Sequence, residues 1–145
     1  MNEADSMPNV VVRISREALW APLAVVILHW LAGGWLGHEP YVDPVMHLAG
    51  GVAAAFFFWR SAECCQRYLG NLSVLVLGLL SFGLATSAAV GWEFAEFLVD
   101  TYRGTSMQRG LANTMRDLFL GLCGAALFVG MRMQIKLPAQ GKQKE

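Results

Sequence analysis

Long apolar stretches alternate with short polar segments along this chain. The apolar stretches cover about residues 19–37, 44–59, 72–99 and 117–133. Each is near the roughly 20 residues that an α-helix needs to cross the hydrocarbon of a bilayer. Because water is absent there, backbone groups must bond within their own segment, which favours helices over strands. The pattern therefore predicts an all-α polytopic membrane protein, a bundle of four transmembrane helices within residues 18–133.

The segments outside these stretches are polar or charged. Residues 1–17 are expected to form a polar N-terminal arm, and residues 134–145 a disordered cytoplasmic tail. Only 15% of the 145 residues are charged and 55% are hydrophobic, whereas about a quarter of a soluble domain is charged. The formal net charge is zero and no basic patch with stacking aromatic residues occurs, so nucleic acid is not an expected partner. The expected partner is the lipid bilayer.

Lysine and arginine residues predict the orientation of the bundle. Of the 11 in the chain, only Arg103, Arg109 and Arg116 fall in a connection on the side away from the two termini. Cytoplasmic connections carry an excess of Lys and Arg. Both termini are therefore expected to face the cytoplasm, as in a multi-pass protein of the bacterial inner membrane.

Polar side chains occur toward one end of every apolar stretch, where hydrocarbon should exclude them. In chain order they are His29, Asp43, His47, Glu93, Glu96, Asp100, Asn113 and Asp117. Glu93, Glu96 and Asp100 are three and four residues apart and so share one helix face. A charge in hydrocarbon costs at least about 2.5–3.5 kcal/mol. These groups are therefore expected to converge, through mutual pairing, a water-filled cavity or a metal ion.

Some of these residues also have purely structural interpretations. Asp43 before Pro44 could cap the second helix. Thr114 and Asp117 fit a capping box at the start of the fourth helix. Asp100 could lie in interfacial water. These alternatives leave the roles of the three aspartates open.

The deeper groups are harder to explain structurally. His29 could be a hydrogen-bonding group between helices, and the three arginines of the outer connection could contact lipid headgroups. Glu93 lies about 10 Å inside its helix, measured from Asp100 at 1.5 Å per residue. Its structural alternative is a protonated side chain bonded to a neighbouring helix. Together with Glu96 and His47, it is the strongest functional signal in the chain.

Three short motifs carry a resemblance to a known group. The segment "DPVMHLAGG" (43–51) resembles D-x-x-x-H-x-x-x-G, and "GWEFAEF" (91–97) resembles an acidic E-x-x-E helix. The segment "NTMRDLFLGLCGA" (113–125) resembles D-x-x-x-D followed by G-A, with Asn113 where an acidic residue is usual. In this order the motifs resemble the YjdF-like and VanZ-like group of small bacterial inner-membrane proteins. The association of VanZ itself with glycopeptide resistance implies work on the envelope or its lipids, without defining a reaction.

The resemblance marks a set of candidate site residues, namely Asp43, His47, Glu93, Glu96 and Asp117. Carboxylates with an imidazole can bind a divalent metal ion, the one cofactor that these residues indicate. Such an ion could activate water or polarise a phosphoryl or carbonyl group of a lipid or envelope substrate. A metal-assisted envelope enzyme is therefore the first hypothesis.

Each candidate residue then has an expected role. Glu93, Glu96 and His47 would be catalytic, with one glutamate as a general base. Arg103, Arg109 and Arg116 would bind the phosphate of a substrate headgroup. His29, Asn113 and Asp100 would support the site.

The second hypothesis is not enzymatic. Intramembrane acids and histidines also serve as proton relays, so the chain could be a small proton- or ion-coupled carrier or a membrane scaffold. A carrier of four short helices would need a homodimer. The sequence does not separate the two hypotheses.

Overall fold

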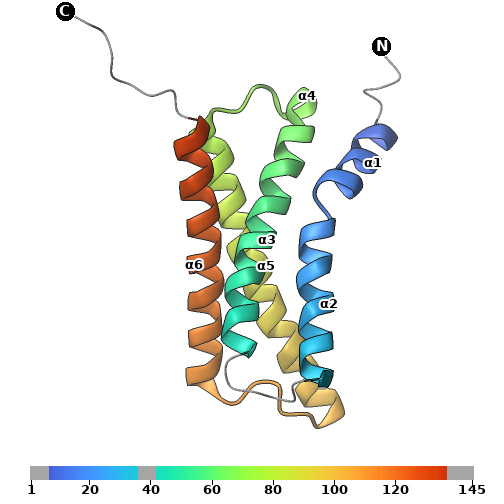
Figure 1. Cartoon of the computed structure of the whole chain (residues 1–145), viewed down its shortest axis with the longest axis vertical. Coiled ribbons are helices and arrows are strands. Elements are labelled where there is room, and N and C mark those ends of the chain that lie inside the picture. The colour runs from blue at the N-terminus through green and yellow to red at the C-terminus, as the bar shows by residue number, and fades with distance from the viewer. Residues whose placement is uncertain (1–6, 36–41, 137–145) are drawn as a thin grey trace, which may run out of the picture.

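The computed structural model describes residues 7–35 and 42–136, and these are helical apart from short connections. The helices are α1 (Met7–Glu17), α2 (Trp20–Trp35), α3 (Val42–Cys64), α4 (Gln66–Leu69), α5 (Val74–Arg103) and α6 (Leu111–Lys136). No strand occurs within the described ranges. Figure 1 shows α2, α3, α5 and α6 running side by side as a bundle. The expected all-α class is confirmed.

Three of these helices, α3, α5 and α6, are long and apolar enough to cross a membrane. The apolar part of α2, Trp20–Ala32, is shorter. A multi-pass membrane protein is therefore supported, while the count of four spans stays a prediction. The turn expected between the first two stretches and most of the expected tail lie outside the described residues.

Several helices extend beyond their predicted bounds. α3 continues to Cys64, and α5 continues to Arg103. The start of α5 is capped by the Ser73 side chain, which accepts from the backbone N–H of Val76, and its end is followed by Gly104 in the left-handed conformation at φ 66°. α6 begins at Leu111, earlier than the hydrophobic pattern indicates, because polar residues occupy its first two turns.

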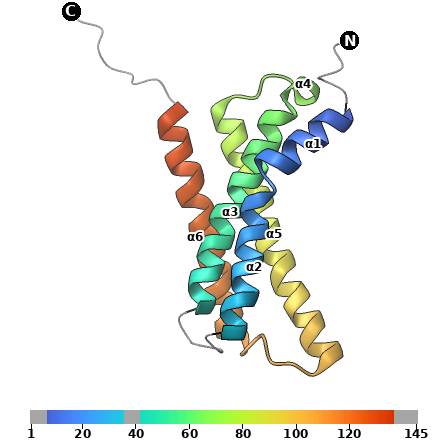
Figure 2. The same cartoon turned by 45° about the vertical axis from the view of Figure 1, so that its right-hand side comes forward.

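The segment expected to be a polar arm contains the amphipathic helix α1. Its apolar residues Met7, Val10, Val11 and Ile14 recur at helical spacing, and Met7 and Val11 are 60% and 58% exposed. α1 lies at the same end of the molecule as the last turn of α6, at an angle to the bundle (Figure 2). An exposed apolar stripe at that position suits the boundary between lipid and water.

Ion pairs join the helices at this end of the bundle. Glu17 of α1 accepts from Arg13 at 3.0 Å and from Arg60 of α3. The hydrogen bond from Arg13 lowers the pKa of Glu17. Glu63 accepts from Trp59 at 2.9 Å and from Lys136 of α6. The negative charges of Glu17 and Glu63 are thus paired with basic side chains.

α3 is the central helix, and small residues let α6 approach it closely. A Cβ atom at Gly51 would overlap the backbone oxygen of Gly121, and one at Gly124 would overlap the backbone oxygen of Leu48. Such glycine contacts are typical of helix pairs in membranes. Trp59, fully buried, fills the core between these helices farther along.

The helix α2 packs differently, since it contacts α3 along its length but makes no close backbone contact with α5 or α6. Its Trp20 ring meets Phe56 of α3 edge to face at 5.6 Å between centroids. Between α2 and α5, the ring of His29 meets that of Trp92 edge to face. This arrangement leaves room for the cavity described below.

Candidate functional site

The predicted polar residues gather at the end of the bundle away from α1. There α3 and α6 begin and α5 ends (Figure 1). The chain direction thus brings the first turns of α3 and α6 beside the last turns of α5. Residues far apart in the sequence meet at one place for this reason.

His47 is at the centre of the cluster. Its Nδ1 atom lies 3.6 Å from Oε1 of Glu93, and its Nε2 atom lies 3.4 Å from Oδ1 of Asp43 and 3.9 Å from Oδ2 of Asp117. The side chain is only 10% exposed, yet Nε2 is buried without a hydrogen bond. Since hydrogen bonds from nitrogen to oxygen are about 2.7–3.2 Å long, the imidazole is surrounded by carboxylates and poorly satisfied by them.

The two glutamates of α5 are buried, with 6% of Glu93 and 5% of Glu96 exposed. The Glu93 side chain accepts a hydrogen bond of 3.2 Å from the Gln108 amide, which also donates to the Glu93 backbone oxygen at 2.8 Å. Glu96 accepts from the indole N–H of Trp92 at 2.8 Å. Neither glutamate has a Lys or Arg ion-pair partner within residues 7–35 and 42–136. Among the described residues, His47 is therefore the basic side chain that lies against these two acids.

Asp117 differs from the glutamates because basic and amide groups already hold it. Its side chain, 1% exposed, accepts from Arg116 at 2.9 and 3.0 Å and from the amide of Asn113. Arg116 also reaches Asp43 at 3.2 Å. The half of the cluster formed by Asp43 and Asp117 is thus compensated by one guanidinium group.

Two of the structural alternatives for the aspartates are corrected by these positions. α3 begins at Val42, so Asp43 lies within its first turn rather than before it, and its carboxylate faces His47 and Arg116. Thr114 and Asp117 lie inside α6, so they form no capping box. The first turn of α6 is already formed before Thr114, since the backbone N–H groups of Asn113 and Thr114 both donate to the backbone oxygen of Gly110.

Asp100 lies outside the cluster around His47. Its carboxylate accepts from Thr105 and from the backbone N–H groups of Met107 and Gln108, both at 2.8 Å. These bonds fold the connection after α5 back toward the bundle. Asp100 thereby positions Gln108 against Glu93, which is a more definite role than contact with interfacial water.

The remaining predicted residues are placed less closely. Of the three arginines, only Arg116 joins the cluster, while Arg103 and Arg109 are exposed near this end of the bundle. His29 of α2 meets the ring of Trp92 edge to face at 6.0 Å between centroids. Gln108 and Trp92 also contact the buried glutamates, although neither is among the residues expected from the sequence. The spacing of Trp92 four residues before Glu96 was a usable signal, whereas Gln108 gave none.

Two sets of side chains have ligand atoms close enough to hold one ion. They are Asp43, His47 and Asp117, and His47, Glu93 and Glu96, with the ligand atoms of each set within 4.8 Å of one another. Ligands about 2.1 Å from a shared ion lie about 3.0–3.4 Å apart in octahedral or tetrahedral geometry. The second set suits a cation better, because Arg116 already supplies positive charge to the first.

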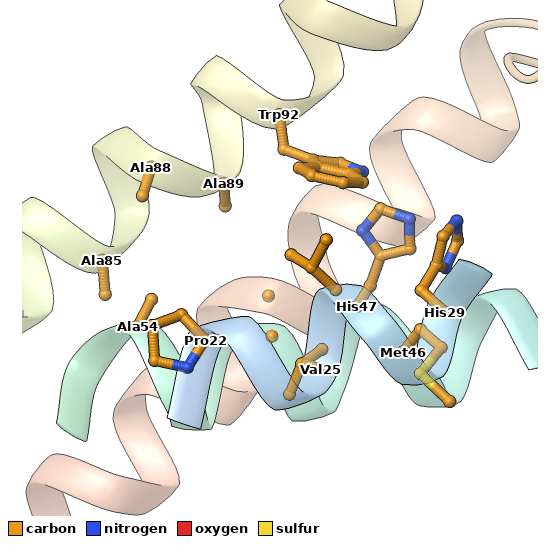
Figure 3. Close-up of a pocket in the computed structure, with 14 residues that line it drawn as sticks. Pro22, Val25, His29, Met46, His47, Ala54, Ala85, Ala88, Ala89 and Trp92 are labelled. Atoms are coloured by element: carbon orange, nitrogen blue, oxygen red, sulfur yellow. The ribbon is translucent and has the colours of Figure 1, made fainter. Parts of the chain in front are cut away.

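An apolar cavity of about 160 Å³ adjoins this cluster between α2, α3 and α5. Figure 3 shows His29, His47 and Trp92 around one end of it, with Pro22, Ala54 and Ala85 toward the other. His47 lines both the cavity and the carboxylate cluster. The polar site is therefore continuous with an apolar compartment.

Comparison with known proteins gives one family. The family described as "Predicted membrane protein (DUF2238)" matches residues 9–136, which cover the bundle and the cluster. No curated protein and no solved structure matches the chain. This family is the YjdF-like one of the sequence analysis, and the match carries no sign of a VanZ-like relationship. The chain thus belongs to the DUF2238 family of predicted membrane proteins.

Proposed function

We propose that the protein is a metal-dependent enzyme of the bacterial inner membrane that acts on a lipid or another envelope substrate. In this proposal both termini face the cytoplasm, all four long helices cross the bilayer, and the cluster around His47 opens to the outer side. One observation carries the proposal. Two buried glutamates, Glu93 and Glu96, share a single imidazole and have no Lys or Arg partner in the described part of the chain.

A divalent cation resolves the energetic problem that these side chains present. Buried carboxylates are costly unless a charge or hydrogen bonds compensate them. Glu93, Glu96 and His47 offer two oxygen ligands and one nitrogen ligand within reach of one ion. Oxygen ligands with one imidazole suit ions such as Mn²⁺, Fe²⁺ or Zn²⁺. These three side chains therefore indicate a divalent cation as the cofactor. The positive charge of that cation would offset the cost of burying the two glutamates.

The chemistry follows from the residues around the ion. When bound, the ion would polarise a phosphoryl or carbonyl oxygen or lower the pKa of a bound water. Asp43, on the other side of the His47 ring, would hold the imidazole in one tautomer. Arg116, whose side chain is 44% exposed, would bind an anionic group of the substrate. The exposed Arg103 and Arg109 stay proposed contacts for a headgroup.

The test is the metal content of purified protein, measured by inductively coupled plasma mass spectrometry. Wild-type protein is expected to retain a stoichiometric transition metal, and Glu96→Gln is expected to lose most of it. Glu63→Gln is the matched control, since Glu63 is also a glutamate of the bundle but has Lys136 and Arg60 as partners. Metal-free wild-type protein, or equal loss in both variants, would contradict the proposal.

A proton- or ion-coupled carrier is the second candidate. It is favoured by the series Glu93, His47 and Asp117, which places an imidazole between acids from two other helices. Such a series can relay a proton. In this case the protein would be metal-free, would form a homodimer in the membrane, and would show uptake that depends on a pH gradient. A membrane scaffold would show neither metal nor uptake.

A further inference from the structure

The cavity between α2, α3 and α5 is lined almost entirely by small or apolar side chains. Its walls include Pro22 and Val25 of α2, Gly50 and Ala54 of α3, and Ala85 of α5. Ala88 also lines it and is exposed, so the cavity is open along α5. Because α2 makes no close backbone contact with α5, the opening lies between two helices rather than at the end of the bundle.

Two adjacent glycines of α3 have different surroundings: Gly51 lies against α6, whereas Gly50 has open space beside it and lines the cavity. Gly51 is needed for packing, because a Cβ there would overlap the backbone of Gly121. A Cβ at Gly50 would have nothing within 4 Å and would project into a lining position of the cavity. Close helix packing therefore explains Gly51 but does not explain Gly50.

One end of the cavity is bordered by the imidazole of His47, which is 90% shielded from solvent. Its Nε2 atom faces the carboxylates of Asp43 and Asp117 at 3.4 and 3.9 Å without forming a hydrogen bond. Figure 3 shows His29 and His47 at this end of the cavity. A ligand that fills the apolar part would therefore bring its polar end to the imidazole and the neighbouring carboxylates.

The occupant is indicated by the surroundings of the cavity. Water needs two to four polar partners to occupy an internal site, and most of these walls offer none. A cavity of about 150 Å³ with apolar walls is known to take a small hydrocarbon such as benzene, and the volume here is about 160 Å³. The helices that line it are apolar and of near-spanning or spanning length, so the hydrocarbon adjacent to the opening would be that of membrane lipids.

We infer that this cavity binds part of an acyl chain of a bilayer phospholipid and places the adjoining polar portion at His47. The inference deepens the proposed function by naming its substrate class, and it rests on that proposal's placement of the helices in the bilayer. It does not depend on a bound metal. The chain enters between α2 and α5, beside Ala88, and the small residues of α3 and α5 leave the space that it fills.

The experiment uses full-length protein in nanodiscs that contain a phospholipid with a photoactivatable diazirine in its acyl chain. Adducts are located by mass spectrometry of peptides after illumination. Wild-type protein is expected to carry adducts at Pro22, Ala54 and Ala85, which line the apolar end of the cavity on three helices. Gly50→Leu fills the cavity and should lower these adducts by about tenfold, a ratio that corresponds to 1.4 kcal/mol of binding.

A control and a second variant keep the result interpretable. Gly83→Leu is matched to Gly50→Leu, since Gly83 is also helical with open space at its Cβ position but does not line the cavity. Ala88→Leu narrows the opposite wall if Gly50→Leu fails to fold. The inference would be overturned by adducts spread evenly over the outer surface, or by equal labelling in Gly50→Leu and Gly83→Leu. It would also be overturned if a photoactivatable polyprenyl lipid, tested in parallel, labelled the cavity and the phospholipid did not. Labelling that persists after chelator treatment supports it, even if the proposed metal is absent.

Discussion

Glutamine in place of Glu93 should separate structure from function at this site. The Glu93 carboxylate is 6% exposed and accepts one side-chain hydrogen bond, of 3.2 Å, from Gln108. A glutamine keeps an oxygen for that bond, and the second bond from Gln108, to the Glu93 backbone, is unaffected. In chelator-treated, metal-free protein, Glu93→Gln should therefore change the free energy of unfolding by no more than about 1 kcal/mol, the usual worth of one hydrogen bond.

The functional effect of the same change should be large. Glutamine lacks an ionisable oxygen, so it neither pairs with a protonated His47 nor serves as an anionic metal ligand. Glu93→Gln is therefore expected to abolish complementation of a deletion phenotype. Glu93→Leu also removes the acceptor for Gln108 and should cost about 1–3 kcal/mol of stability, because a buried polar group loses its partner.

Thermal unfolding in detergent and complementation at equal expression measure the two effects. The expected pattern is wild-type stability without function for glutamine, and reduced stability without function for leucine. Full complementation by Glu93→Gln would show that function does not require an ionisable group at this position. In that case Glu93 would hold the helices together through a hydrogen bond that an amide replaces.

Three further changes test other parts of the description. Gly124→Ala should destabilise the bundle by about 1–3 kcal/mol in thermal unfolding, because the added Cβ would meet the backbone of α3. The control Gly83→Ala, which has open space at its Cβ, should be neutral or stabilising. Equal effects of the two changes would contradict the close packing of α6 on α3. Arg116→Gln should destabilise by about 1–3 kcal/mol, since buried Asp117 loses two charged hydrogen bonds, and unchanged stability would show that Asn113 suffices. Ser106→Cys should react with a membrane-impermeant thiol reagent from outside and Gln66→Cys only from inside in a cysteine-free background, and the reverse pattern would overturn the proposed topology.

The helix-forming parts of the fold could be predicted from sequence because hydrophobic length decides them. Helices α3, α5 and α6 follow from apolar stretches that no soluble fold would expose. The amphipathic α1 was missed because its apolar residues are too few to stand out from a polar segment, although Met7, Val11 and Ile14 have helical spacing. The early start of α6 was missed because Asn113 and Asp117 look polar enough to belong to a connection.

The convergence of the polar residues was also predictable in outline. Spacing put Asp43 with His47 on one face and Glu93 with Glu96 on another, and the cost of burying them implied that they meet. The path of the connection after α5 was not predictable, because it depends on three hydrogen bonds to Asp100 that only the folded backbone makes. For this reason Gln108, which contacts Glu93, could not be found from the sequence.

The distinction between the two halves of the cluster likewise required the structure. In sequence, Arg116 belongs with Arg103 and Arg109 as one of three outer arginines. In the fold, Arg116 alone reaches Asp117 and Asp43. That contact leaves Glu93 and Glu96 as the uncompensated pair, and the proposed ion belongs there.

X-ray absorption spectroscopy of the metal-loaded protein in detergent can show whether His47 and the buried acids hold an ion, because it reports the ligands of that ion. We predict one imidazole nitrogen with oxygen ligands at about 2.0–2.2 Å, and loss of the imidazole signal in His47→Gln. The variant Glu63→Gln, altered at the opposite end of the bundle, should give the wild-type spectrum. A protein that holds no metal, or an imidazole signal that persists in His47→Gln, would exclude the proposed metal site at His47.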